Sequence, residues 1–300
     1  MKTMPRIALV SARAARDLDE DLAPLHVALA AAGAQVAIVD WDDEAVDWAE
    51  FDLAVLRSTW DYTNRLDAFL AWAERVDRAT RLLNPFDIVR WNTDKHYLGE
   101  LADAGVAIVP SSFIEPGADP EAGLAAFLDA HAAAEFVVKP CVGAGSRDAQ
   151  RHGREHVVAA QAHVRRLLDA GRSVLLQPYL ARVDDDGETA LIHVDGRFSH
   201  AIRKGPLLRR GEDATRALFA AEQIQAREPS TDEHDLARRT LAALPRTHGL
   251  AYARVDLIRA DDGSPRVLEL ELVEPSLFFA HAEGAAERFA RALLARCTGA

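Results

Sequence analysis

Two cysteines, two methionines and no long apolar run set the first limits on this chain of 300 residues. Cys141 and Cys297 lie far apart, so they offer neither the close spacing of a zinc site nor a disulfide framework. The first ten residues contain no apolar stretch of signal-peptide length, and no later stretch is long enough to span a bilayer. We therefore expect a protein of the reducing cytoplasm without a membrane partner, in which Cys141 is a small packed thiol.

Basic residues are also in deficit, and the formal net charge is −12. This charge argues against a nucleic-acid partner, because non-specific binding to nucleic acid needs a basic surface. A local cluster of Lys and Arg could still bind an anionic ligand. The hydrophobic content of 49% and the charged content of 27% are typical of a globular protein, and 300 residues leave room for two or three domains.

Glycine motifs of the common nucleotide-binding folds are missing as well. No G-x-G-x-x-G follows the first expected strand, at 6–10, and no G-x-x-x-x-G-K-[ST] occurs. The chain instead begins with strand, helix and strand patterns at 6–10, 19–32 and 35–39, with a third strand at 52–56. This order predicts an α/β fold with a parallel sheet in a first domain that ends near residue 90.

The stretch 252–279 predicts a β-hairpin, because turn residues separate two apolar-rich runs. We set its register by pairing Ala260 with Pro265. Residues two apart on a strand share a face. This register therefore gathers four charged side chains on one face: Arg254, Asp256, Glu269 and Glu271. The opposite face is apolar and is predicted to face the core: Val255, Leu257, Leu268, Leu270 and Leu272.

Carboxylates that lie opposite one another destabilise a sheet, so the acidic face needs a reason. A divalent cation supplies one, because Mg²⁺ takes hard oxygen ligands and commonly binds through carboxylates and phosphates. Asp256, Glu269 and Glu271 are therefore the predicted metal ligands. A charged face in contact with solvent is the alternative.

A polar loop, RSTWDY at 57–62, follows the third strand. Open α/β sheets bind ligands beyond the carboxyl ends of their strands. Arg57, Thr59 and Asp61 are therefore candidates for binding a small amino acid. A helix cap together with a packed Trp60 explains the same residues equally well.

Lys139 lies near the end of an apolar strand at 135–140, and a loop of small residues follows at 141–147. Glycines let backbone N–H groups approach a phosphate closely. An ordinary turn beside a surface lysine is the alternative. Residues 211–230 are polar and predict a mobile segment.

Further along, a strand at 173–180 ends in a proline bend, and two strands at 188–194 and 197–204 form a hairpin. The second of these ends in Arg203-Lys204. Two adjacent cations could bind a polyphosphate or form a solvated edge.

In this order, the features resemble the ATP-grasp superfamily of carboxylate–amine ligases. The resemblance covers nearly the whole chain and implies three domains: an N-terminal α/β domain at 1–90, a central lid domain at 91–180 and a C-terminal catalytic domain at 181–300. It also implies ATP, one or two Mg²⁺ ions and a small amino-acid-like substrate. A homodimer is left open.

The resemblance also implies roles for single residues. Nucleotide contacts are expected at Lys95, Lys139, Gly143, Gly145, Ser146, Gln177, Tyr179, Leu180, Glu188 and Lys204. Catalytic roles are expected for Arg254, which would stabilise an oxyanion, and for Lys204. Substrate contacts are expected at Arg57, Thr59, Asp61, Arg203, Glu274 and Ser276. Glu271 stands where many relatives carry Asn, and Glu274-Pro275-Ser276 replaces their Ser-Pro-Gly loop, so the metal geometry and the acceptor pocket are open to change.

Three runs resemble the cycloserine synthetase branch more narrowly: RSTWDY at 57–62, SHAIRKGP at 199–206 and LELELVEPSLFF at 268–279. Members of that branch cyclise O-ureido-D-serine to the antibiotic D-cycloserine. The resemblance implies that ATP activates the substrate carboxylate as an acyl phosphate, which the substrate's own nitrogen then attacks. An intermolecular amino-acid or dipeptide ligase and a non-enzymatic nucleotide-binding protein are the alternatives.

Overall fold

The computed structural model describes residues 4–209, 211, 223–245 and 249–297. A parallel four-stranded sheet with the order β2–β1–β3–β4 lies at the N-terminal end. Its elements are β1 (Arg6–Ser11), α1 (Leu22–Ala31), β2 (Gln35–Asp40), β3 (Leu53–Ser58), α2 (Leu66–Ala79) and β4 (Arg81–Leu83). Both faces of this sheet are packed, which explains the apolar strands β1 and β3 and confirms the predicted α/β arrangement.

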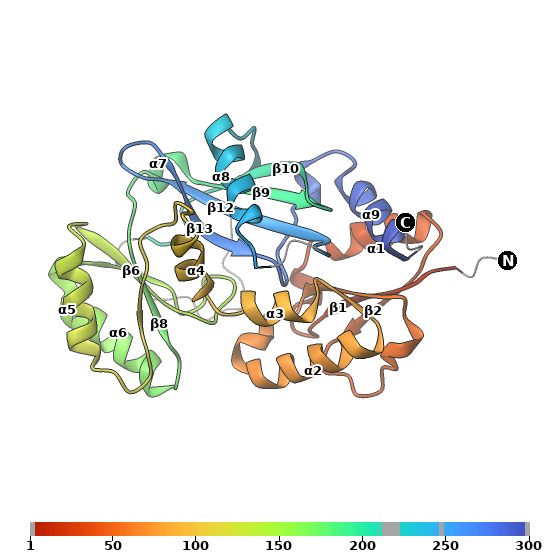
Figure 1. The fold of residues 1–300 in the computed structure, drawn as a ribbon, viewed down its shortest axis with the longest axis horizontal. Coiled ribbons are helices and arrows are strands. Elements are labelled where there is room, and N and C mark those ends of the chain that lie inside the picture. Colours follow the sequence, from red (N-terminus) through yellow and green to blue (C-terminus); the bar gives the residue numbers. More distant parts are fainter. Residues whose placement is uncertain (1–3, 210, 212–222, 246–248, 298–300) are drawn as a thin grey trace.

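A second, antiparallel sheet forms the lobe on the left of Figure 1, with the order β5–β8–β6–β7. Its elements are β5 (Ser112–Ile114), α5 (Pro120–Ala130), β6 (Glu135–Pro140), β7 (Gln150–Gly153), α6 (Val157–Asp169) and β8 (Val174–Pro178). Apolar side chains of α5 and α6 pack with those of the strands and form a core of their own.

The third sheet is antiparallel, with the order β11–β10–β9–β12–β13. Its elements are α7 (Val183–Asp186), β9 (Glu188–Val194), β10 (Arg197–Lys204), β11 (Ile224–Ala226), α8 (Thr231–Ala242), β12 (Tyr252–Arg259), β13 (Pro265–Glu271) and α9 (Ala285–Cys297). Both predicted hairpins are present. Within the stretch 211–230, for which we expected a mobile segment, β11 pairs with the edge of β10; residues 212–222 of that stretch lie outside the described part of the chain.

Two short helices, α3 (Phe86–Asn92) and α4 (Tyr97–Asp103), connect the first two sheets. Their buried side chains join the core of the third sheet, and residues 107–109 pair with β13 near Val267. The edge strand β13 is thereby covered, which protects an otherwise open sheet edge. The division of the chain into domains at residues 90 and 180 stays a prediction.

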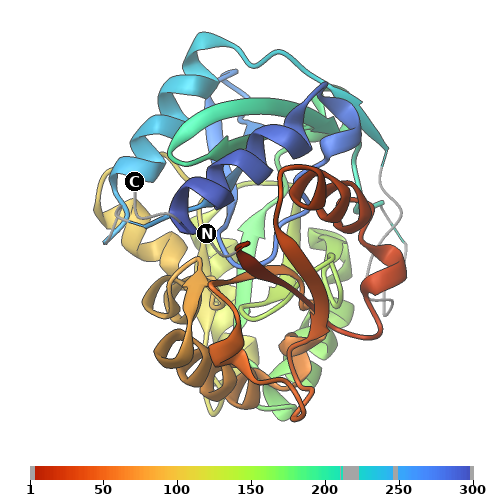
Figure 2. The same cartoon turned by 90° about the vertical axis from the view of Figure 1, so that its right-hand side faces the viewer.

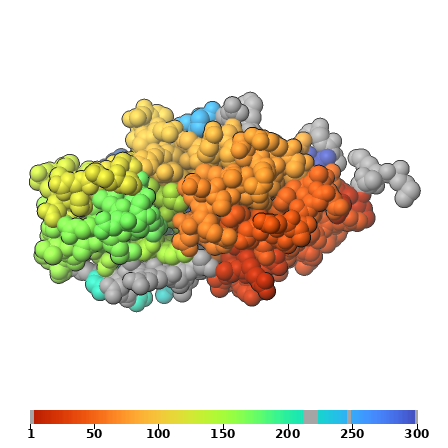
Figure 3. All heavy atoms as spheres, turned by 90° about the horizontal axis from the view of Figure 1, so that it is seen from below, coloured from red at the N-terminus to blue at the C-terminus, as the bar shows by residue number. Residues whose placement is uncertain are grey.

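Helices α1 and α9 lie side by side between the first and third sheets, as Figure 2 shows in red and blue. Seen from below, the N-terminal part of the chain, in red and orange, lies beside the lobe of the second sheet, in yellow and green (Figure 3). Single turns of 3-10 helix occur at Arg16–Leu18, Trp48–Glu50, Trp60–Asn64, Arg154–His156 and Phe279–His281. Among the described residues, no helix combines the length and the apolar character needed to cross a membrane.

Candidate active site

The hairpin of β12 and β13 carries the charged face that the sequence predicts. Asp256 pairs with Glu269 across the hairpin, and Arg254 pairs with Glu271. All four residues line one cavity, which lies where the second and third sheets and the N-terminal sheet approach each other. The predicted cross-strand pairs are therefore confirmed.

The hairpin reaches this register by a different route. Arg259 pairs with Pro265, so the predicted partner Ala260 is wrong and the turn is one residue longer. A bulge between Asp256 and Leu257 then shifts the register by one residue and restores the predicted pairs. Leu268, opposite the bulge, lines the cavity, so its assignment to the core face is also wrong.

Cations from three separate segments neutralise the carboxylates. Asp256 accepts from Arg254 Nε at 2.8 Å and from Lys204 Nζ at 2.8 Å. Lys95 Nζ lies 2.8 Å from Glu269 Oε1. These contacts bring together β12, β10 and the turn before α4, and they hold the two carboxylates ionised.

The pKa values reflect this pairing. Burial would raise the pKa of Asp256, but Arg254 and Lys204 outweigh it and hold this pKa well below its usual range. Burial likewise opposes the effect of Lys95 on Glu269, whose pKa is lowered. Two carboxylates therefore stay charged in a buried site.

Three further carboxylates in the cavity behave differently. Burial raises the pKa of Glu188 to about 8, although it forms an ion pair with Lys204. Burial also raises the pKa of Glu271 to about 7 and that of Glu274 to about 8. The site thus contains more carboxylates than it can hold ionised without an additional cation.

Lys139 differs from the other cations. No hydrogen bond or ion pair joins its ammonium group to another residue in the described part of the chain, and burial lowers its pKa. Its side chain lines the cavity beside the loop that follows β6. A lysine without a protein partner, held in a cavity, is suited to an anionic ligand.

The small-residue loop after β6 borders the same cavity. Lys95 Nζ donates to the carbonyl of Gly143 at 2.8 Å. Gly145 and Ser146 have positive φ angles of 62° and 58°, and Arg172 holds the start of the loop through the carbonyl of Val142 at 3.1 Å. These contacts hold the loop in a defined conformation, which a loop that covers phosphates requires.

The segment Gln177–Leu180 at the end of β8 forms another wall of the cavity. The side chain of Gln177 donates to Ser111 Oγ at 3.0 Å, and Tyr179 Oη donates to Asp184 at 2.5 Å. The ring of Tyr179 also stacks under the guanidinium of Arg151. Tyr179 N also donates to Glu135 O at 2.9 Å, and Leu180 O accepts from Val183 N at 3.0 Å, so only the remaining backbone groups of this segment could bind a ligand.

The structure brings most of the predicted site residues into this one cavity. They are Lys95, Lys139, Gly143, Gly145, Ser146, Gln177, Tyr179, Leu180, Glu188, Lys204, Arg254, Asp256, Glu269, Glu271, Glu274 and Ser276.

Arg57 and Thr59 do not line the cavity. Arg57 is buried, and its Nη2 donates to the carbonyl of Pro275 at 2.8 Å. Thr59 is fully buried, and its hydroxyl has no hydrogen-bond partner. The Arg57 guanidinium also lies over the ring of Tyr252 on β12, so this side chain packs between the first and third sheets.

Asp61 and Arg203 are also outside the cavity lining. Asp61 accepts from Trp41 Nε1 at 2.8 Å and from Arg65 at 2.5 Å. Arg203 donates to the carbonyls of Asp186 at 2.8 Å and Asp185 at 2.9 Å, so it holds the end of α7. A substrate role for these four residues stays a prediction, which the cavity lining does not support.

Sequence reasoning missed several cavity residues, among them Trp60, Tyr62, Asn92 and Arg147. Tyr62 donates a hydrogen bond to Glu274, and burial together with that carboxylate raises the pKa of Tyr62 well above its usual value. Trp60 and Tyr62 stand in the same polar loop as Asp61, one residue to either side. The available signal was the position of this loop after a strand of the parallel sheet.

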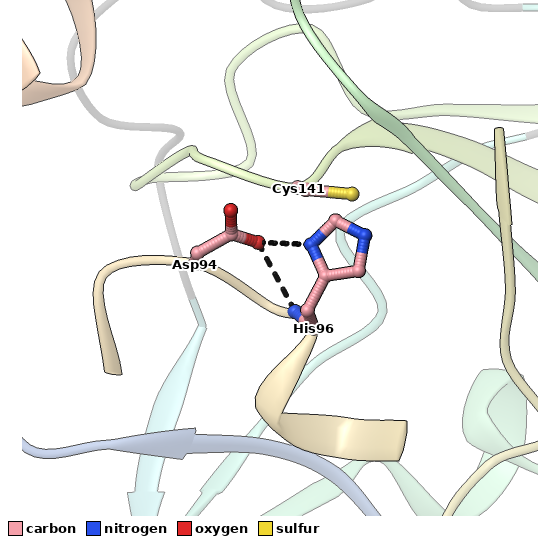
Figure 4. Close-up of side chains that lie close together, drawn as sticks. All are labelled: Asp94, His96 and Cys141. Atoms are coloured by element: carbon pink, nitrogen blue, oxygen red, sulfur yellow. Dashed lines mark hydrogen bonds and ion pairs between the residues drawn. The ribbon is translucent and has the colours of Figure 1, made fainter. Parts of the chain in front are cut away.

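A second cluster of chemically active side chains lies outside the cavity (Figure 4). Ligand atoms of Asp94, His96 and Cys141 lie within 4.8 Å of one another. His96 Nδ1 is 2.6 Å from Asp94, and its Nε2 is 2.8 Å from Glu115. Both ring nitrogens thus face carboxylates, and these contacts raise the pKa of His96 although burial opposes them. Burial raises the pKa of the Cys141 thiol above its usual range.

The fold and the site define a class of protein. D-alanine–D-alanine ligase from Bacillus anthracis, solved with ATP, superimposes with a TM-score of 0.68 at 14% identity and covers 98% of each chain. ATP-grasp ligase PsnB, solved with its minimal precursor, gives a TM-score of 0.66 at 20% identity and covers 98% of this chain and 100% of its own. These similarities show that the chain has the ATP-grasp fold, in which α-helices and mixed β-sheets combine.

More similar relatives narrow this class. A family model described as the N-terminal domain of D-cycloserine synthetase DcsG matches residues 7–84. The cycloserine biosynthesis protein DcsG of Streptomyces lavendulae is 43% identical over 295 residues, which cover 97% of this chain and 98% of the relative. The crystal structure of D-cycloserine synthetase DcsG gives a TM-score of 0.92 at 42% identity and covers 97% of this chain and 99% of its own. The chain belongs to the DcsG family of cycloserine synthetases.

Proposed function

We propose that this chain cyclises O-ureido-D-serine to D-cycloserine in an ADP-forming reaction. The 43% identity to DcsG over 97% of the chain carries the proposal. Geometry supports it, because Arg254 and the carboxylates of the β12–β13 hairpin share one cavity with Lys139 and the small-residue loop.

On the nucleotide side, the phosphates of ATP bind in this proposal between Lys95, Lys139 and the loop at 143–146. The unpaired ammonium of Lys139 and the backbone N–H groups of the loop supply the contacts. Glu188 binds the ribose hydroxyls. Backbone groups of Gln177–Leu180 receive the adenine, since the side chains of Gln177 and Tyr179 are already engaged.

The donor set of the hairpin suits a magnesium ion. Asp256, Glu269 and Glu271 present hard carboxylate oxygens from two adjacent strands, and the excess of carboxylates calls for one more cation. These three residues would hold one or two ions. A bound ion neutralises charge on the phosphates and on the transferring phosphoryl group.

The reaction itself needs no nucleophile from the protein. Transfer of the γ-phosphoryl group to the substrate carboxylate gives an acyl phosphate and ADP. The substrate's own aminooxy nitrogen then forms a C–N bond to that carbon, loses a proton and expels phosphate. Loss of the carbamoyl group with one water, as carbon dioxide and ammonia, completes the balance to D-cycloserine.

Arg254 is the residue that stabilises the oxyanion of the attack in this scheme, with Lys204 beside it. Both are held in place by Asp256. Ser276 and Glu274 border the same end of the cavity and bind the polar tail of the substrate. A site built for such hydrogen bonds rejects analogues that lack the partner groups.

The mass of the product tests the proposal. Purified protein, ATP and Mg²⁺ are incubated with O-ureido-D-serine alone, with its L-isomer, and with pairs of D- and L-amino acids. A cyclised product formed together with ADP from the single D-substrate is expected. ADP formation only with a second amino acid, and a linear dipeptide as the product, would instead indicate an intermolecular ligase.

Nucleotide binding without turnover of any substrate in the panel would indicate a protein that binds ATP but is not a ligase of these amino acids. The homodimer left open by the sequence stays a prediction, which light scattering coupled to size-exclusion chromatography decides.

A further inference from the structure

Asp21 directly precedes α1, at the position where an aspartate side chain ordinarily caps its own helix. Its carboxylate makes no hydrogen bond to the backbone of α1. It accepts instead from three consecutive amides of a distant segment: Leu277 N at 2.5 Å, Phe278 N at 2.9 Å and Phe279 N at 2.8 Å. Both carboxylate oxygens are thus committed to residues that follow the catalytic hairpin.

This contact is buried and holds an unfavourable backbone. Asp21 is only 4% exposed, so water could not take the place of these three N–H donors if they moved away from the carboxylate. Phe278, the middle of the three residues, has a φ angle of 53°. A bulky residue in the left-handed region persists only where its surroundings hold it there.

The segment that Asp21 holds is part of the cavity wall. The carbonyl of Ser276 accepts from Arg254 Nη1 at 3.0 Å, and the ring of Phe278 lies 5.4 Å from the Arg254 guanidinium carbon. Glu274 and Ser276 line the cavity. A shift of this segment would therefore move both the guanidinium and the two polar side chains next to it.

Other side chains hold the backbone of the same segment through its carbonyl groups. Trp60 Nε1 donates to Glu274 O at 3.1 Å, Arg57 Nη2 to Pro275 O at 2.8 Å, and His200 Nε2 lies 2.7 Å from Leu277 O. Among these side chains, Asp21 alone supplies an acceptor. Its loss would leave three neighbouring N–H groups buried without that acceptor.

We infer that Asp21 is a positioning residue for the ligase reaction: it fixes the segment 274–279 and, through that segment, the orientation of Arg254. The inference rests on the proposed function insofar as Arg254 acts on the reacting carboxylate. The nucleotide side of the cavity is built from other elements and does not depend on Asp21.

Asp21→Asn tests the inference, because it keeps the size of the side chain and removes one acceptor oxygen. ADP release with O-ureido-D-serine and nucleotide affinity are measured for the wild type and the variant. The expected result is a kcat lower by about 10- to 100-fold, as for a misplaced catalytic group, with the KM for ATP within about two-fold of the wild type. An unchanged kcat, or a fall in the apparent kcat that is fully accounted for by an equal fall in the number of nucleotide-binding sites per chain, would overturn the inference.

A readout that needs no substrate separates this test from that of the proposed function. In protein labelled with 5-fluorotryptophan, the ¹⁹F resonance of Trp60, assigned through Trp60→Phe, should shift in Asp21→Asn, because the indole N–H contacts Glu274 O. An unmoved resonance would count against the inference even if the wild type proves inactive with this substrate. Wild-type inactivity alone would count against the proposed function.

Asp119→Ala is the matched control. Asp119 caps α5 by accepting from Glu121 N at 2.9 Å, far from the cavity wall. Its loss should lower the melting temperature and leave kcat unchanged. Asp21→Ser, whose single hydroxyl is one bond shorter, is expected to lower kcat at least as much as Asp21→Asn. Failure of both Asp21 variants to fold would overturn the inference, since Asp21 would then be needed for folding first.

Discussion

The polar residues of the β12–β13 hairpin and those at 57–62 differ in how well the sequence predicts which side chains line the cavity. On the β12–β13 hairpin, four charged side chains predicted to share one face do share it, and all of them line the cavity. At 57–62, three residues predicted to bind a substrate are absent from the cavity lining: Arg57 near the end of β3, Thr59 and Asp61. Their neighbours Trp60 and Tyr62 line it instead.

The difference lies in what determines the direction of a side chain. On a strand, the direction follows from the register, and neighbours two apart must agree. In a short 3-10 turn such as Trp60–Asn64, no such period exists, and packing decides which residues face inward. Position at the end of a strand therefore predicts that a loop is near the site, but not which of its residues face the site.

Loss of a carboxylate from the hairpin face should have the largest effect. Glu269→Gln keeps the volume of the side chain but removes a charge that faces Lys95 and Asp256. We expect kcat to fall by at least about 100-fold, because the Mg²⁺ ion that would neutralise the transferring phosphoryl group would lose one of its carboxylate ligands. ADP release measures this.

Glu233→Gln is the control for that variant. Glu233 is also buried and accepts from Thr189 Oγ1 at 2.8 Å, but it lies outside the cavity lining. Its replacement should lower the melting temperature with little effect on turnover. Near-normal activity of Glu269→Gln would remove the basis for the metal assignment. Strand register would then predict functional residues no better than position in a loop does.

The next effect concerns Lys139, which the strand β6 directs into the cavity. Lys139→Met should weaken ATP binding by about 10-fold or more, since a cation–phosphate contact of more than 1.4 kcal/mol corresponds to that factor. Nucleotide titration by calorimetry measures it. Arg197→Met, in the exposed turn between β9 and β10, removes an equal charge from the surface and should leave the affinity unchanged. Equal affinities in all three proteins would show that Lys139 does not contact the nucleotide.

Much of the fold could be predicted because its periods are local. The apolar runs of β1 and β3, the hairpin of β9 and β10, and the opposed charges on β12 and β13 all follow from spacing. The hairpin register was nevertheless reached through two errors that cancel. The turn is one residue longer than predicted, and the bulge beside Leu257 compensates for it. A bulge leaves no period in the sequence, so the direction of Leu268 could not be derived.

What could not be predicted depends on contacts between distant parts of the chain. Asn84 and Asn92 bind the backbone of the third sheet from residues more than 160 positions away. The three-residue strand β11 is too short to show a pattern, and it exists because β10 offers an open edge. Such contacts are decided by the tertiary fold, and no local sequence rule reports them.

A pair of variants sharpens the comparison at the substrate end. Ser276→Ala should raise the KM for the amino-acid substrate by about 10-fold through loss of a hydrogen bond, with the KM for ATP unchanged. Asp61→Asn should leave both KM values within about two-fold and lower stability by about 1 kcal/mol, because Asp61 binds Trp41 and Arg65. Steady-state kinetics and thermal melts measure both. A selective rise in the substrate KM for Asp61→Asn would instead indicate that Asp61 contacts the substrate.

The smallest expected effect comes from His96, which follows the cavity residue Lys95 but points away from the cavity. Partial burial would lower the pKa of His96, yet its hydrogen bonds to Asp94 and Glu115 outweigh burial and raise this pKa above the ordinary 6.5. A raised folded-state pKa stabilises the protein fully below the unfolded-state value, and this stabilisation is lost as the pH rises through the folded-state value. The melting temperature of His96→Gln should therefore lie below that of the wild type at pH 6, and the gap should narrow from pH 6.5 upward. A gap that stays constant across this range would mean that His96 stabilises the turn by packing on Phe113 rather than by charge.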